Sequence, residues 1–135
     1  MSIQFSTSVR NARLDAIETT ISTSAIMKIR TGAAPADCGT ADSGTVLATL
    51  SLPSDWLAAA SGGSKAKSGT WQDASADATG TAAHFRIYDS GGTVCHIQGT
   101  VTATGGGGDL TLDNTSIATG QTVTITSFSL TDGNA

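Results

Sequence analysis

The chain has 135 residues, of which 39% are hydrophobic and only 13% are charged, and its formal net charge is −4. Disordered chains combine low hydrophobicity with high charge, so this composition predicts a folded protein, and the length suits one domain over residues 1–135. An acidic chain without a basic stretch is not expected to bind nucleic acid. The densest basic pair, Lys65 and Lys67, lies among glycine and serine and is interpreted as part of a solvated loop.

The chain also lacks the sequence patterns of export and membrane insertion. Its N-terminus has no charged region followed by an apolar run, and no apolar stretch approaches the length of a membrane span. We therefore expect synthesis in the cytoplasm and no membrane partner.

The first predicted element is a helix. Hydroxyl side chains at residues 6–8 can cap a helix, and Leu14, Ile17 and Ile21 recur at helical spacing after them. A helix is therefore predicted over about residues 8–21, ahead of a β-rich region over residues 25–131.

Alternating apolar and polar side chains predict short strands in that region. The expected strands lie at residues 25–30, 46–52, around 71, 83–88, 93–101, 109–113 and 121–130. Residues 54–60 are expected to form one or two helical turns capped by Ser54. Within the last strand the apolar positions change parity near Thr126, which predicts a bulge or bend there.

The clearest strand pair is a hairpin. Aligning its apolar faces places Phe85 opposite Ile97 and Ile87 opposite Cys95, and leaves Ser90 to Gly92 as a three-residue loop. One N-terminal helix and about seven short strands between glycine-rich turns together predict a mainly β protein. An antiparallel β-sandwich or jelly roll is the architecture that fits this pattern.

No catalytic or metal-binding set stands out. The run Gly105 to Gly108 lacks the Lys-Ser/Thr pair of a phosphate-binding loop, and Asp73 and Asp77 miss the spacing of a calcium loop. In the predicted register His96 lies beside Arg86, whose charge disfavours a proton or a metal ion. Both histidines, at 84 and 96, are therefore interpreted as surface or interface residues. We expect no enzymatic activity, no metal and no cofactor.

The cysteines and tryptophans each leave two interpretations open. Cys38 and Cys95 are too few for a metal site, so they are expected to be free thiols, with a disulfide that closes after cell lysis as the alternative. Trp56 and Trp71 are interpreted as core or interface anchors, and stacking on a sugar is the alternative. Aromatic residues make up only 4% of the chain, which is low for a carbohydrate-binding module.

Six segments spread over nearly the whole chain have a familiar composition and order. They are RNARLDAIE (10–18), MKIRTGAAPA (27–36), LPSDW (52–56), GTAAHFRIY (80–88), DLTLDN (109–114) and GQTVTIT (120–126). Together they resemble small structural proteins encoded in the head-gene modules of tailed phages and prophages. The best-understood proteins of similar size and character are capsid decoration, or cement, proteins, which are β-sandwiches or jelly rolls seated on the outside of the capsid as dimers or trimers.

The resemblance implies a virion protein at the capsid surface that is made in the host cytoplasm. The expected partners of this protein are the major capsid protein and further copies of itself. The resemblance implies no active-site residues. We expect the contacts to involve the N-terminal segment, the loop at residues 32–44 and the turn around Trp56. The candidate partner-binding residues are Ile3, Phe5, Arg30, Pro35, Trp56 and Trp71. A phage tail component such as a tube, fibre or tip protein is the alternative, followed by a carbohydrate-binding module.

Overall fold

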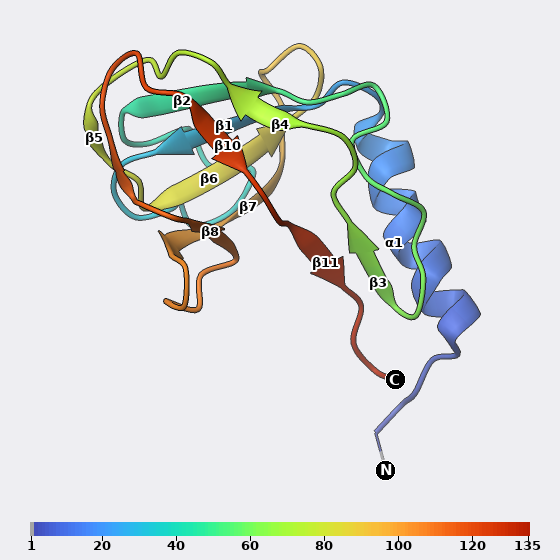
Figure 1. Ribbon diagram of the computed structural model, residues 1–135. Coiled ribbons are helices and arrows are strands. Elements are labelled where there is room, and N and C mark those ends of the chain that lie inside the picture. The colour runs from blue at the N-terminus through green and yellow to red at the C-terminus, as the bar shows by residue number, and fades with distance from the viewer. Residues whose placement is uncertain (1) are drawn as a thin grey trace.

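The computed structural model describes residues 2–135, which form one helix and eleven strands (Figure 1). In chain order the elements are α1 (Thr7–Ile21), β1 (Ile26–Arg30), β2 (Val46–Ser51), β3 (Ser64–Ala66), β4 (Trp71–Asp73), β5 (Gly80–Thr81), β6 (His84–Tyr88), β7 (Cys95–Ala103), β8 (Leu110–Leu112), β9 (Ser116–Ile117), β10 (Val123–Ile125) and β11 (Ser129–Thr131). The prediction of a mainly β protein with one N-terminal helix is confirmed.

The main sheet has the strand order β2-β1-β6-β7-β8. Its strands are antiparallel except for β7 and β8, which run parallel, and the sheet is curled. A sandwich or jelly roll is therefore not confirmed. The edge at β2 is covered, because Thr49 N donates to the Asp73 carboxylate and Asp77 N donates to Leu47 O.

Three two-stranded ribbons complete the molecule: β10 with β4, β11 with β3, and β5 with β9. The strand predicted over residues 121–130 is divided between two of these ribbons, because β10 pairs with β4 and β11 pairs with β3. The predicted change near Thr126 is the point where the chain passes from one partner to the other. Phe128 is buried just after this change.

Helix α1 confirms the helix predicted over about residues 8–21, and it begins one residue earlier, at Thr7. The Ser6 hydroxyl caps it by accepting a hydrogen bond from Val9 N at 3.3 Å. Leu14 and Ile21 are buried and Ile17 is partly buried, so the predicted stripe faces the rest of the protein. Figure 1 shows α1 running beside β3 and pointing away from the main sheet.

An aromatic cluster lies at the centre of the core. The ring of Trp71 is 6.0 Å from that of Trp56 and 5.3 Å from that of Phe128, and Phe85 meets Phe128 edge-on at 5.7 Å. These separations are typical of favourable aromatic pairs. The cluster joins the main sheet to the ribbons and to the segment before β3.

The helical turns predicted at residues 54–60 are absent, so that prediction was wrong. Leu57 instead forms a β-bridge with Lys67, and Ala58 N donates to Ala66 O at 2.8 Å. Pairing with the neighbouring ribbon satisfies backbone groups that a helical turn would have paired internally.

The hairpin of β6 and β7 exists, but its register differs from the predicted one. Ile87 pairs with Ile97 and Phe85 pairs with Gly99, and a bulge after Ile87 places Cys95 opposite Tyr88. Gly99 leaves room for the Phe85 ring, since a Cβ at position 99 would lie 2.8 Å from that ring. The apolar pattern alone does not predict this fit between an aromatic ring and a glycine.

The hairpin turn is also longer than predicted. Asp89 Oδ1 accepts hydrogen bonds from Thr93 N at 3.2 Å and from Val94 N at 3.3 Å. The side chain thus closes a wider turn than the three-residue loop that the sequence favoured.

Candidate functional site

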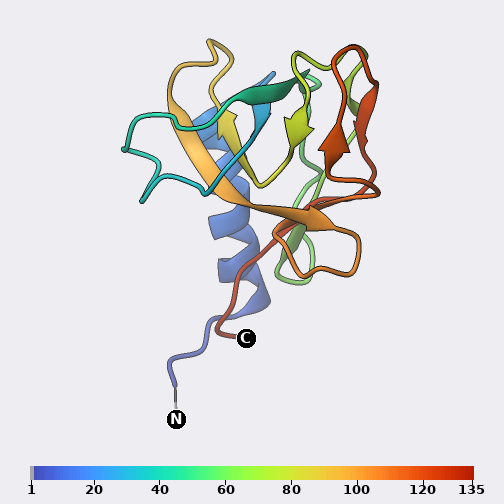
Figure 2. The same cartoon turned by 90° about the vertical axis from the view of Figure 1, so that its left-hand side faces the viewer.

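Both faces of β6 are buried. Phe85 and Ile87 point into the core, whereas His84, Arg86 and Tyr88 lie on the opposite, outer face. Polar side chains on a buried face need partners. These partners come from residues 31–45, the connection between β1 and β2, which we call the outer loop (teal in Figure 2).

Arg86 is the centre of this arrangement and is only 2% exposed. Its guanidinium donates to Asp42 Oδ1 at 2.6 Å, to Asp37 O at 2.8 Å and to Thr40 O at 2.9 Å. It also donates to Gln98 Oε1 of β7 at 3.0 Å through Nε and at 2.9 Å through Nη2. One buried arginine therefore holds three points of the outer loop against the sheet.

Asp42 is shared by three side chains. Arg30 Nη2 lies 3.0 Å from Oδ2, and Tyr88 donates its hydroxyl to Oδ1 at 2.7 Å. Burial alone would raise the pKa of Asp42, but the Tyr88 hydroxyl and the guanidinium groups of Arg86 and Arg30 outweigh it and lower the pKa. Asp42 is therefore ionised at neutral pH, and it partly neutralises two buried cations.

Two further side chains complete the cover of the outer face. His84 is fully buried and its Nδ1 donates to Gly32 O at 2.7 Å, since a carbonyl oxygen can only accept. Its Nε2 has no hydrogen-bond partner among residues 2–135. Gln98 donates to Pro35 O at 2.8 Å. The interpretation of His84 as a surface residue was wrong, because the outer loop covers the face on which it lies.

Of the candidate partner-binding residues, Arg30 and Pro35 belong to this region. Arg30 is 6% exposed and its guanidinium is already occupied by Asp42 and by the carbonyl oxygens of Ser43 and Gly44. Pro35 is half-buried, and its carbonyl is bound to Gln98. Both residues therefore hold the outer loop in place, and their contact with a partner stays a prediction.

A surface hollow of about 440 Å³ lies between the outer loop and the start of β7. Cys38 and Cys95 both line it, together with Asp42, Arg86 and Val94. Burial, followed by the hydrogen-bonded Cys38 thiol, raises the pKa of Cys95 to about 12. Both cysteines are free thiols in the structure, which agrees with the simpler of the two interpretations.

The N-terminal segment, which contains Ile3 and Phe5, lies at one end of the molecule beside the C-terminus (Figure 1). Phe5 N donates to Asn134 O at 2.7 Å, and the Arg13 guanidinium lies 5.0 Å from the centre of the Phe5 ring. Ile3 is 76% exposed and has a free apolar side chain. We call residues 2–5 the terminal arm.

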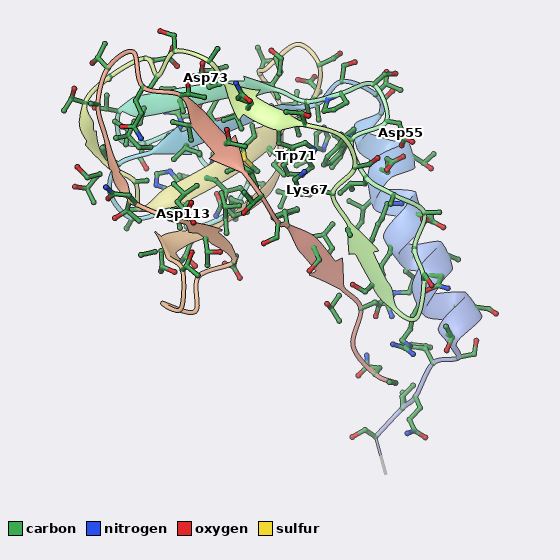
Figure 3. All side chains as sticks on the ribbon, viewed as in Figure 1. Asp55, Lys67, Trp71, Asp73 and Asp113 are labelled. Carbon is green, nitrogen blue, oxygen red and sulfur yellow. The ribbon has the colours of Figure 1, made fainter. Side chains whose placement is uncertain are left out.

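Trp56 and Trp71 do not lie at a surface. Both are fully buried, and their indole Nε1 groups donate to Ser22 O at 2.9 Å and to Ser68 O at 3.1 Å. Figure 3 shows Trp71 inside the molecule with Lys67 beside it, where Lys67 Nζ lies 5.8 Å from the ring centre. The tryptophans are core residues, so they present no surface to a partner or to a sugar ring in this structure.

The interpretation of Lys65 as part of a solvated loop was also wrong. Lys65 is 2% exposed, and its Nζ lies 2.7 Å from Asp15, 2.8 Å from Ala58 O and 3.5 Å from Glu18. Because Asp15 and Glu18 belong to α1, this lysine fastens the helix to β3.

Asp73 and Asp77, the two carboxylates considered for a calcium loop, both bind Thr49 instead. Asp73 and Asp77 bind Thr49 N and Thr49 Oγ1, respectively, both at 2.8 Å. Within residues 2–135 no group of three or more histidine, cysteine or acidic side chains is arranged to hold a metal ion. In the same part of the chain, no helix is both long and apolar enough to cross a membrane.

Comparisons with protein-family models, with curated proteins and with solved structures find no match to this chain. Function is therefore inferred from the residues and their arrangement. The sequence pointed to the outer loop and the terminal arm, but not to Arg86, Asp42 and Gln98. Three polar side chains at alternate positions of an otherwise apolar strand, at 84, 86 and 88, were the available signal for a covered outer face.

Proposed function

We propose that this protein is a structural component of a tailed-phage particle, namely a capsid decoration protein that binds the outside of the major capsid protein shell and stabilises it. The observation that carries the proposal is the exposed terminal arm on a domain whose basic side chains are bound internally. The resemblance of the six sequence segments to phage head-module proteins supplies the class of partner.

The charged groups of the basic side chains already have partners within the chain. Every lysine and arginine places a nitrogen within 3.5 Å of an oxygen of the same chain. These residues are Arg10, Arg13, Lys28, Arg30, Lys65, Lys67 and Arg86. A partner that meets this surface therefore finds hydroxyl, amide, apolar and carboxylate groups but few unpaired cations, which suits a protein surface better than the phosphates of nucleic acid.

The terminal arm is the best candidate for the contact. Ile3, Val9 and Val94 are the large hydrophobic side chains that stand exposed among the described residues, and Ile3 is the most exposed of them. An apolar side chain on a short extended segment can enter a pocket of a neighbouring protein or add to the edge of its sheet. Repeated over a shell, such modest contacts stabilise the whole particle through avidity.

Self-association into a dimer or trimer is part of the proposal. The edge of β7 supports it, because β8 pairs with β7 only at Val101–Ala103 and residues 95–99 have no strand on that side within the described chain. A second copy can pair with such an edge. The finer architecture of a closed β-sandwich, like that of known decoration proteins, belongs to the same proposal.

Cryo-electron microscopy of the parent particle tests the location directly. We expect density for this chain on the outer face of the capsid, in a copy number set by the capsid symmetry. The chain should also be present in purified tail-less heads. Its presence in tails and absence from such heads would instead assign it to the tail.

Binding to heads that lack the protein tests the terminal arm. We expect Ile3→Asp to weaken co-sedimentation with these heads by about ten-fold or more, because a charge replaces the apolar contact. Val94→Asp is the matched control, since Val94 is also exposed, at 51%, but lies in the turn between β6 and β7. Equal binding of both variants and the unaltered protein would contradict a contact through the arm.

Stabilisation of the shell needs a separate measurement. We expect heads that lack the protein to rupture at a lower temperature, or on milder osmotic shock, than heads that carry it. If the two kinds of head rupture alike, the cement role is wrong even where binding is observed.

A further inference from the structure

We propose that Cys38 and Cys95 form an intramolecular disulfide under oxidising conditions, which fastens the outer loop to β7 by a covalent bond. This inference does not depend on the proposed function. It follows from the way in which the sheet positions the two thiols.

The outer loop is held on both sides of Cys38. Arg86 Nη2 donates to Asp37 O at 2.8 Å and to Thr40 O at 2.9 Å. Because Arg86 is buried in the sheet, the backbone is held over β6 and β7 one residue before and two residues after Cys38. Cys38 therefore has little freedom to move away from the sheet.

The bulge in the hairpin brings Cys95 to the same side. In the predicted register Cys95 shared the inner face with Ile87, but the bulge after Ile87 pairs Cys95 with Tyr88 instead. The Tyr88 hydroxyl donates to Asp42 of the outer loop at 2.7 Å. Tyr88, the partner of Cys95 in the hairpin, therefore lies on the outer face beneath this loop. Cys38 and Cys95 thus line one hollow.

The protonation of Cys95 is consistent with two facing thiols. Burial and the hydrogen-bonded Cys38 thiol raise the pKa of Cys95 to about 12. The thiolate is the form that exchanges with disulfides. Exchange through Cys95 therefore becomes faster as the pH rises.

Oxidised glutathione is a sufficient oxidant for the reaction. A cysteine thiolate attacks one glutathione sulfur, so that the glutathione S–S bond breaks and a mixed disulfide forms with release of one glutathione. The second cysteine then attacks the protein sulfur of the mixed disulfide, which forms the Cys38–Cys95 bond and releases the second glutathione. The two cysteines lose two protons and two electrons, and the two glutathione molecules gain them.

The bond would close a ring that contains β2 to β6 and would restrict the unfolded chain. Disulfides across long loops stabilise proteins mainly in this way. A disulfide here also prevents the outer loop from opening even where the Arg86 hydrogen bonds are broken. In oxidising surroundings the outer loop is thus fastened covalently over the outer face, and reduction of the bond releases it again.

The test compares the full chain incubated with oxidised glutathione with the same chain kept in a phosphine reductant. We expect the oxidised monomer to lose the mass of two hydrogens and to have no titratable thiol. Trypsin digestion of the unfolded, unreduced protein should release residues 31–65 and 87–135 as one joined species that separates on reduction. The midpoint of thermal unfolding should rise by about 10 °C.

The matched controls are Cys38→Ser and Cys95→Ser, singly and together. They should show no oxidant-dependent rise in the unfolding midpoint, and serine should fit either site because its volume is close to that of cysteine. Thiols that remain titratable, a bond between two chains instead of within one, or a disulfide that leaves the unfolding midpoint unchanged would each overturn the proposal.

Discussion

Gly99 is a position where one missing side chain fixes the pairing of two strands. A Cβ at this residue would lie 2.8 Å from Phe85 Cε1 and 2.9 Å from Asp109 Oδ2. Neither neighbour moves easily, since Phe85 is buried against Phe128 and Asp109 Oδ2 accepts a hydrogen bond from Thr100 N. The glycine thus determines the register of the hairpin.

We expect Gly99→Ala to lower the free energy of unfolding by about 1–3 kcal/mol, the usual cost of overpacking a core. Chemical denaturation followed by tryptophan fluorescence measures the change. The control is Gly133→Ala, because the space around that glycine is open and its φ is not positive. If both variants are equally stable, the fit between Phe85 and Gly99 does not set the register.

Asp42 matters because it lies between two buried guanidinium groups. We expect Asp42→Asn to lower the free energy of unfolding at pH 7 by about 2 kcal/mol, below the usual cost of breaking a fully buried ion pair, because the carboxylate is 40% exposed. Urea denaturation of the two proteins at matched ionic strength measures the difference.

The pH dependence of that difference has a definite sign. The pKa of Asp42 is lowered from its ordinary value of 3.8, so folding favours the ionised form. The extra stability of the unaltered protein should be constant above about pH 5 and should shrink as the pH falls through the lowered pKa. A difference that is independent of pH down to full protonation would show that the charge of Asp42 does not contribute.

At the scale of elements, Lys65 connects α1 to β3. Its ammonium group is buried between Asp15, Glu18 and Ala58 O, and the hydrogen bond with Lys65 is the main cause that lowers the pKa of Asp15. We expect Lys65→Ala to lower the free energy of unfolding by about 2 kcal/mol and to raise the pKa of Asp15. Denaturation and carboxyl titration by NMR measure the two effects.

Lys67 is the matched control for that experiment, because it lies two residues further along and its ammonium group donates to Gly69 O and lies over the face of Trp71, with no acidic partner among the described residues. Lys67→Ala should change the stability by less than about 1 kcal/mol and leave the pKa of Asp15 unaltered. If the two substitutions have the same effect, Lys65 does not dock the helix.

The elements that the sequence predicts well are those with regular apolar spacing. Helix α1, β1, β2 and β8 follow from that spacing because each buries its apolar face. The short strands β3, β5 and β9 have two or three residues each, too few for an alternation to be visible. Residues 54–60 have helical propensity, but they pair with the chain beside β3 instead of forming the predicted helical turns.

The candidate site was less predictable than the fold. Residues 32–44 were expected to be important, but the sequence does not indicate that they fold back onto β6. This fold-back buries His84 and Arg86, and it arises from contacts more than forty residues apart, such as Arg86 with Asp42. The bulge that places Cys95 opposite Tyr88 also departs from the register that the apolar pattern favours.

At the scale of the whole molecule, different regions should open to solvent with different free energies. Strands β1 and β6 lie between other strands, and β6 is buried on both faces. We expect their amide hydrogens to exchange most slowly with solvent and those of residues 105–107, an exposed glycine run, to be among the fastest. Hydrogen-exchange mass spectrometry measures this order, and equal rates in the two regions would contradict the central place of β6.

The adjacency of the two chain ends has a practical consequence. Gln4 Nε2 donates to Ala135 O at 3.0 Å, so a short linker can join the ends without disturbing α1 or β11. New ends are best opened in the glycine run at residues 105–107, which Figure 1 places away from the termini. A cargo fused to either end of this chain stands beside the terminal arm and obstructs it, whereas a circularly permuted chain presents the cargo elsewhere and leaves the arm free.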